Sequence, residues 1–204
     1  MMDDGGCAEV EGDALAFLDW AGADPQDPVS VGALCVAATG RRPRRVPLDG
    51  EARLEPRGDG LEVLVNEGLT PARSRLKAAH ELGHWWYERV GYRGRDIEHR
   101  CDLFGAAIVA PWPAFKASMR WAGHRVHDLA RCFNTTQSLA LLRVGEVSGR
   151  PVMLLRPAGP IVRGEAFVWP RTSTVVRALG EGRAAVHPLR INDEPDRVGL
   201  MARR

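Results

Sequence analysis

Two segments in the middle of the chain carry hydrophobic residues at helical spacing. In residues 70–91, apolar or small side chains recur every three or four positions, at Ala72, Leu76, Ala79, Gly83, Trp86 and Val90. Thr70 and Pro71 have the residue types of an N-cap and a first helical position, and Gly91 is typical of a helix end. A second apolar stripe runs through residues 96–111, at Ile97, Cys101, Phe104 and Ile108, where Asp96 can cap the start and Pro111 ends the pattern. We therefore predict two consecutive helices.

Shorter patterns precede these helices. Residues 9–20 form an amphipathic segment, and Ser30 can cap a helix that ends at Gly40. Segments 52–55 and 61–66 have the residue types of strands and flank a turn sequence rich in glycine, which predicts a hairpin. We expect a small sheet beside the helix at 70–91, with segment 61–66 near a cleft, where an edge strand can bind an extended peptide through main-chain hydrogen bonds.

The first long helix contains the pattern H-E-x-x-H, as His80-Glu81-Leu82-Gly83-His84. Residues four apart lie on one face of a helix, so both imidazoles can reach one metal ion. Glu81 lies next to that ion and can take a proton from a bound water. The pattern is typical of zinc hydrolases, usually metallopeptidases.

A catalytic zinc site needs a third protein ligand and leaves one position for water. In the second predicted helix, Glu98 and Asp102 lie one turn apart on a common face. We expect Glu98 to bind the metal and Asp102 to accept a hydrogen bond from the distal nitrogen of a ligand histidine, which fixes its tautomer. Asp102, His99 and Cys101 remain alternatives for the third ligand, although His99 and Cys101 point away from that face.

Together these residues resemble the ImmA/IrrE family of H-E-x-x-H metallopeptidases. The resemblance rests on the His80–His84 motif and on the helix from Glu98 to Pro111, in which Asp102 and Ala110 replace the usual Asn and Met. It covers about residues 70–147. It implies an intracellular protease of bacteria, phages or integrative elements, of which several cleave a partner helix-turn-helix repressor and so derepress stress or mobile-element genes.

The C-terminal third changes character. Residues 127–144 have helix-turn-helix spacing, but the second helix offers only Arg143 as a cation, beside Gln137 and Ser138, so we do not expect direct nucleic-acid binding. Residues 150–204 alternate apolar runs with proline, glycine and arginine, which predicts strands at 152–155, 166–169, 174–177 and 184–187. The expected fold class is α+β, with a zincin-like metallopeptidase core at 1–123, a helix-turn-helix-like hairpin at 124–149 and a β-rich extension at 150–204.

Composition adds few constraints. The chain has 204 residues and a net charge of +2, which gives no general case for nucleic-acid or membrane binding. The run Arg41-Arg42-Pro43-Arg44-Arg45 is interpreted as a solvated turn before a strand at 46–48. The start lacks signal-peptide features and the 4 cysteines form no C-x-x-C pair, so we expect a cytoplasmic protein with reduced thiols and no membrane association.

The predicted function is a zinc-dependent endopeptidase with one Zn²⁺ per chain and Glu81 as the base. The predicted substrate is a helix-turn-helix repressor or antitoxin in bacterial stress response or mobile-element control. The residues Tyr87, Tyr92, His124 and His127 are candidates for an oxyanion donor. One alternative is a catalytically silent, zinc-bound scaffold that sequesters a repressor, against which the intact Glu81 argues. Another is a DNA-binding regulator, against which the scarce positive charge argues. No oligomeric state is predicted.

Overall fold

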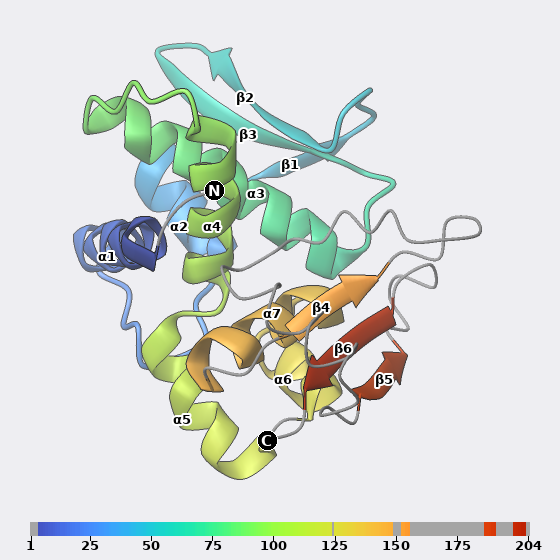
Figure 1. Cartoon of the computed structure of the whole chain (residues 1–204). Coiled ribbons are helices and arrows are strands. Elements are labelled where there is room, and N and C mark those ends of the chain that lie inside the picture. The colour runs from blue at the N-terminus through green and yellow to red at the C-terminus, as the bar shows by residue number, and fades with distance from the viewer. Residues whose placement is uncertain (1–3, 124, 149–151, 156–185, 191–197, 203–204) are drawn as a thin grey trace.

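The computed structural model describes residues 4–123, 125–148, 152–155, 186–190 and 198–202 (Figure 1). Within these residues the chain is a mixed α+β protein with seven helices and two three-stranded sheets. The helices are α1 (Asp4–Trp20), α2 (Val31–Thr39), α3 (Pro71–Arg89), α4 (Ile97–Val109), α5 (Trp112–Ala122), α6 (Val126–Cys132) and α7 (Gln137–Ser148). The strands are β1 (Arg44–Val46), β2 (Ala52–Arg57), β3 (Gly60–Asn66), β4 (Val152–Leu155), β5 (Val186–Arg190) and β6 (Val198–Ala202). No helix in the described ranges is long and apolar enough to span a membrane.

The predicted helix ends are largely confirmed. The Thr70 hydroxyl accepts a hydrogen bond from the N–H of Arg73 at the start of α3, and Pro71 occupies the first turn. Ser30 caps α2 in the same way, and Gly40 ends it with a φ of 72°, a conformation that favours glycine. The expectation for Asp96 is wrong in one respect: it precedes α4, but within the described chain its side chain makes no capping hydrogen bond to that helix.

The first sheet lies above α3 in Figure 1 and has the order β1-β3-β2. β1 pairs with β3 in parallel and β2 pairs with it antiparallel, through the predicted hairpin turn at Gly58. The central strand is thus β3, so segment 61–66 is not a sheet edge; β2 is the edge strand that contacts α3. The basic run is also more ordered than expected, because Arg44 and Arg45 belong to β1, and Arg44 pairs with the buried Glu62.

Helices α3 and α4 form the centre of the first hydrophobic core and cross at very short range. Two glycines make the approach possible. A Cβ atom at Gly105 of α4 would lie 2.9 Å from the backbone nitrogen of His80, and one at Gly83 of α3 would lie 3.0 Å from the Cα of Cys101. Contacts this short between backbones exclude any larger residue unless the helices move apart. The two halves of the predicted metal site are therefore held together by glycine packing.

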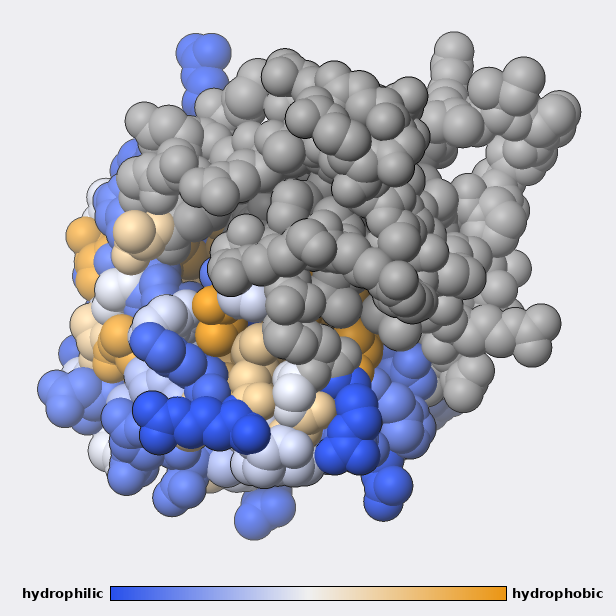
Figure 2. All heavy atoms as spheres, turned by 60° about the horizontal axis from the view of Figure 1, so that its bottom comes forward, coloured by the Kyte–Doolittle hydropathy of each residue, from blue (hydrophilic) through white to orange (hydrophobic). Residues whose placement is uncertain are grey.

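Helices α5 to α7 surround a second hydrophobic core, which includes Phe115, Phe133 and Leu141. The three polar side chains that a DNA-binding α7 would have to offer are buried here: Gln137 and Ser138 are each 5% exposed, and Arg143 is 3% exposed. The hairpin α6–α7 is therefore a packing element whose second helix turns these three side chains inward. Seen from the side of α5, the described surface has small hydrophobic groups interspersed among hydrophilic residues (Figure 2).

The second sheet has the order β4-β6-β5, with both pairs antiparallel. The predicted strand at 152–155 is confirmed as β4, and the one at 184–187 overlaps β5. β6 was not predicted, and the expected strands at 166–169 and 174–177 lie outside the described residues.

Candidate metal centre

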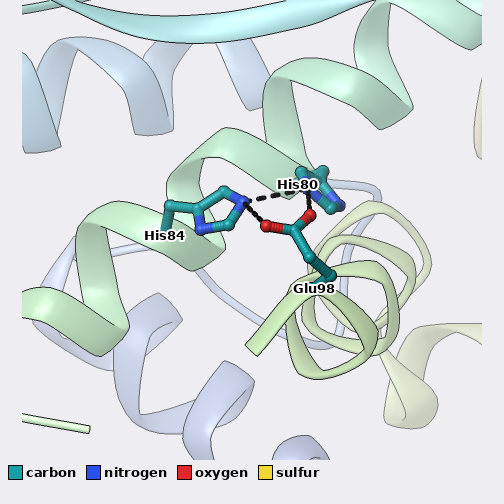
Figure 3. Close-up of side chains that lie close together, drawn as sticks. All are labelled: His80, His84 and Glu98. Atoms are coloured by element: carbon teal, nitrogen blue, oxygen red, sulfur yellow. Dashed lines mark hydrogen bonds and ion pairs between the residues drawn. The ribbon is translucent and has the colours of Figure 1, made fainter. Parts of the chain in front are cut away.

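Three predicted ligands converge at the crossing of α3 and α4. His80 and His84 project from one face of α3, and the Glu98 carboxylate from the first turn of α4 points between their rings (Figure 3). The Nε2 atoms of the two histidines are 3.1 Å apart. Glu98 places one oxygen 3.4 Å from His80 Nε2 and the other 3.5 Å from His84 Nε2. The four-residue spacing in α3 and the glycine-tight crossing with α4 together create this arrangement.

The spacing fits a zinc ion. Nitrogen and oxygen ligands at about 2.0–2.1 Å from a tetrahedral zinc lie about 3.3–3.4 Å from one another. The three separations between His80, His84 and Glu98 fall within a few tenths of an ångström of that value. Two imidazoles and one carboxylate are also a ligand set that zinc accepts in hydrolases. These residues could therefore hold a zinc ion after only small side-chain adjustments.

Asp102 orients His80. Its carboxylate lies 2.8 Å from His80 Nδ1, on the opposite side of the ring from Glu98. Burial by itself lowers the pKa of His80, but the hydrogen bond and the negative charge of Asp102 outweigh it, so the pKa is raised. A proton on Nδ1 leaves the Nε2 lone pair directed at the other ligands, which is the tautomer that metal binding requires. The expected role of Asp102 as a hydrogen-bond partner is thus present in the geometry.

Glu81 is buried between α3 and the edge strand β2. Burial raises the pKa of its carboxyl group, against the lowering effect of the nearby histidines and of a hydrogen bond donated by the Leu54 backbone N–H. Leu54 belongs to β2, so the main-chain donor to the predicted base comes from the edge strand and not from segment 61–66. Sequence analysis did not identify Leu54, because it contributes a main-chain N–H, which every residue type except proline has.

Cys101, an alternative third ligand, and the described candidates for an oxyanion donor are engaged in contacts away from the three ligands. Cys101 is buried against Gly83, and burial raises the pKa of its thiol to about 12. Tyr87 donates a hydrogen bond to Asp13 of α1, and Tyr92 donates one to Asp96, so both hydroxyl groups are engaged away from the three ligands. His127 pairs with Gln137 in the α6–α7 hairpin, and His124 lies outside the described residues.

Comparison with known proteins identifies the domain. Residues 47–144 match the model of the peptidase M78 family, described as the IrrE N-terminal-like domain. No curated protein matches the chain. Among solved structures, a Mycobacterium tuberculosis transcriptional regulator is similar with a TM-score of 0.62 and 14% identity, over 88% of this chain and 64% of the regulator. This likeness supports the fold alone, and the chain spans less than two thirds of the regulator.

The matched segment begins just after β1 and ends within α7, so it contains the H-E-x-x-H helix, the edge strand β2 and the whole of α4. The family resemblance seen in the sequence is thereby confirmed. Residues 47–144, just under half of the chain, are thus similar to the IrrE N-terminal-like domain of the peptidase M78 family, in agreement with the resemblance to the ImmA/IrrE family.

Proposed function

We propose that the protein is a zinc-dependent endopeptidase with a zincin-like core. The observation that carries this proposal is the convergence of His80, His84 and Glu98 beside a buried glutamate, Glu81, that follows the first of the two histidines. A scaffold that only bound zinc would need the three ligands and no carboxylate in the position of Glu81. The site therefore supports hydrolysis better than metal storage alone.

The protein groups have distinct chemical roles in this proposal. A zinc ion held by the three ligands would lower the pKa of a bound water to about 7 and polarise the scissile carbonyl. Glu81 takes the proton of the attacking water and delivers it to the leaving amine. Burial raises the pKa of Glu81, which makes its carboxylate a stronger base toward the water proton than an exposed one would be. Asp102 keeps His80 in the tautomer that binds metal.

The substrate is an extended peptide segment. The β2–β3 hairpin closes at the pair Arg57 and Gly60, and alternation from there turns the N–H and C=O groups of Leu54 away from β3. The Leu54 N–H is donated to Glu81, so the Leu54 C=O and the main chain toward Ala52 are the groups of β2 that can bind a peptide laid along it. Pro56 has no N–H to offer, so donor groups on this edge come from the Ala52 end of the strand.

We further propose that the natural substrate is a helix-turn-helix repressor or antitoxin in the cytoplasm of a bacterium, cleaved during stress or mobile-element control. In this proposal residues 1–123 are the peptidase core, 124–149 a helical hairpin and 150–204 an extension. The family resemblance supports the substrate class. The burial of Gln137, Ser138 and Arg143 supports a protein partner over DNA.

The test separates metal binding from chemistry. Zinc-loaded wild-type protein and Glu81→Gln are incubated with a peptide library made from a bacterial proteome, and new peptide termini are identified by mass spectrometry. We expect wild type to bind one zinc and create new termini, and Glu81→Gln to keep the zinc and create none, because the amide cannot accept the proton.

Two results would contradict the proposal. If wild-type protein stays metal-free in zinc-containing buffer, the proposed zinc site is wrong. Zinc-bound wild type that cleaves neither the library nor a co-incubated helix-turn-helix protein would favour the second candidate, a silent scaffold that sequesters a repressor.

A further inference from the structure

Glu98 has the least local support of the three ligands. Its side chain is 74% exposed, whereas those of His80 and His84 are 11% and 28% exposed. It stands in the first turn of α4, which Asp96 does not cap with its side chain. Helix ends without capping groups fray, because their first N–H groups have no intrahelical partner. A ligand in such a turn needs another source of rigidity.

The opposite face of the same turn provides one. Arg100 lies two residues after Glu98 and therefore on the other side of α4, where its side chain is only 6% exposed. Its guanidinium approaches Glu9 at 3.0 Å and Asp13 at 3.3 Å, both on α1. It also packs over the ring of Tyr92 at 4.5 Å and the ring of Tyr87 at 5.4 Å from the ring centres.

The two tyrosines complete the enclosure. Tyr87 of α3 donates a hydrogen bond to Asp13, and Tyr92 donates one to Asp96, the residue directly before α4. We call the set Glu9, Asp13, Tyr87, Tyr92 and Arg100 the arginine cage. It joins the first turn of α4 to both α1 and α3. Guanidinium groups favour such sites because they pair with carboxylates in a fixed plane and stack on aromatic rings.

We propose that Arg100 is a positioning residue for Glu98, so that α1 forms part of the metal site through the arginine cage. The inference rests on the proposed zinc site and extends it beyond the matched family segment, because α1 lies before residue 47. The cage clamps the ligand-bearing turn from the side opposite the two histidines. Glu98 then meets the metal without the entropic cost of ordering a frayed turn.

The test uses the α1 side of the cage, which contains no proposed ligand. The double variant Glu9→Gln and Asp13→Asn keeps size and weakens the grip on Arg100. We expect zinc affinity, measured by competition with a chelating dye, to fall about 10-fold, as for other groups that orient a ligand. Amide exchange in the metal-free variant should accelerate at Arg100, whose N–H donates to the Asp96 carbonyl at the start of α4. The single variant Asp13→Asn serves in its place if the double variant does not fold.

Two controls separate positioning from general stability. Glu11→Gln disturbs a similar buried pair on the same helix, with Arg143, which binds the carbonyl of Ala110 at the far end of α4. It should lower thermal stability and leave zinc affinity nearly unchanged. In a Glu98→Ala background, the cage variant should cause no further loss of affinity, since its effect acts through Glu98.

The outcomes distinguish the two proposals. Suppose that wild type binds zinc and the cage variant binds it with the same affinity; the positioning role is then wrong and the metal site stands. The same conclusion follows if the cage substitutions lower zinc affinity by the same factor in the Glu98→Ala background as in wild type. If wild type takes up no zinc, the proposed function fails and this inference fails with it.

Discussion

At the residue scale, the site depends on which atom of each side chain faces the metal position. His80 shows this most clearly, because Asp102 binds Nδ1 and Glu98 approaches Nε2. Two carboxylates one helical turn apart thus have different roles: Asp102 orients the His80 ring, and Glu98 is placed to bind the metal. Their exposure differs too: the Asp102 side chain is 37% exposed and that of Glu98 is 74% exposed.

Substitution of these two carboxylates should give unequal effects. Asp102→Ala removes only the partner of Nδ1, so we expect zinc affinity to fall about 10–100-fold. Glu98→Ala removes a direct ligand and should cost more. Competition with a chelating dye measures both variants against wild type. A larger loss for Asp102→Ala would reverse the two assignments, and equal affinity in all three proteins would place the third ligand outside α4.

At the element scale, the important feature is the distance between α3 and α4. Gly83 and Gly105 let the two backbones touch, and that contact brings Glu98 across to the two histidines. The hairpin β2–β3 then lies against α3 and delivers a backbone N–H to Glu81. The arrangement of the candidate catalytic side chains thus depends on close contacts between backbones, at which Gly105 leaves room for His80 and Gly83 leaves room for Cys101.

Gly105→Ala should therefore damage the metal site from inside the core. Its new methyl group would meet the backbone of His80 at 2.9 Å, so α4 must shift away from α3. We expect a loss of about 1–3 kcal/mol in the free energy of unfolding, typical of overpacking, together with weaker zinc binding. The matched control is Gly12→Ala in α1, where the added group meets nothing within 4 Å; it should be neutral or stabilise by up to about 1 kcal/mol. Unchanged zinc affinity in Gly105→Ala would show that the crossing is not needed for the site.

At the scale of the whole molecule, α1 connects the two hydrophobic cores. Glu11 forms a pair of contacts of 3.0 Å each with Arg143 of α7, and Arg143 also donates to the carbonyl of Ala110. Glu9 and Asp13 on the same helix hold Arg100 of α4. Two buried arginines therefore join α4 and α7 to one N-terminal helix.

Arg143→Ala should be strongly destabilising. Removing one member of a buried ion pair leaves charge without compensation and costs about 3–5 kcal/mol, which denaturant unfolding can measure. Binding to duplex DNA at low salt should be no weaker than in wild type, because the side chain faces the core. A variant of native stability with reduced DNA binding would instead reveal an exposed Arg143 and restore the DNA-binding interpretation of α7.

The local features of this protein could be predicted from residue types and their spacing. Helical periodicity with the Thr70 cap predicted α3, and periodicity with Pro111 predicted α4. The spacing of His80, His84 and Glu98 selected the three groups that the structure brings together. These features depend on contacts within one or two helical turns, which residue types encode directly. The α+β class followed from the same patterns.

Other features of the site depend on long-range packing and could not be predicted in this way. The edge position of β2, the Leu54 N–H on Glu81 and the inward direction of Arg143 depend on contacts between segments far apart in the chain. Amphipathic spacing alone cannot tell a DNA-facing arginine from one that is paired in a core. The arginine cage is a further case, since Arg100 and Asp13 are 87 residues apart and meet only when α1 packs on α4. Packing between distant segments decides which of the locally possible partners meet. Here the packing of α4 on α3 brings Glu98 to His80 and His84.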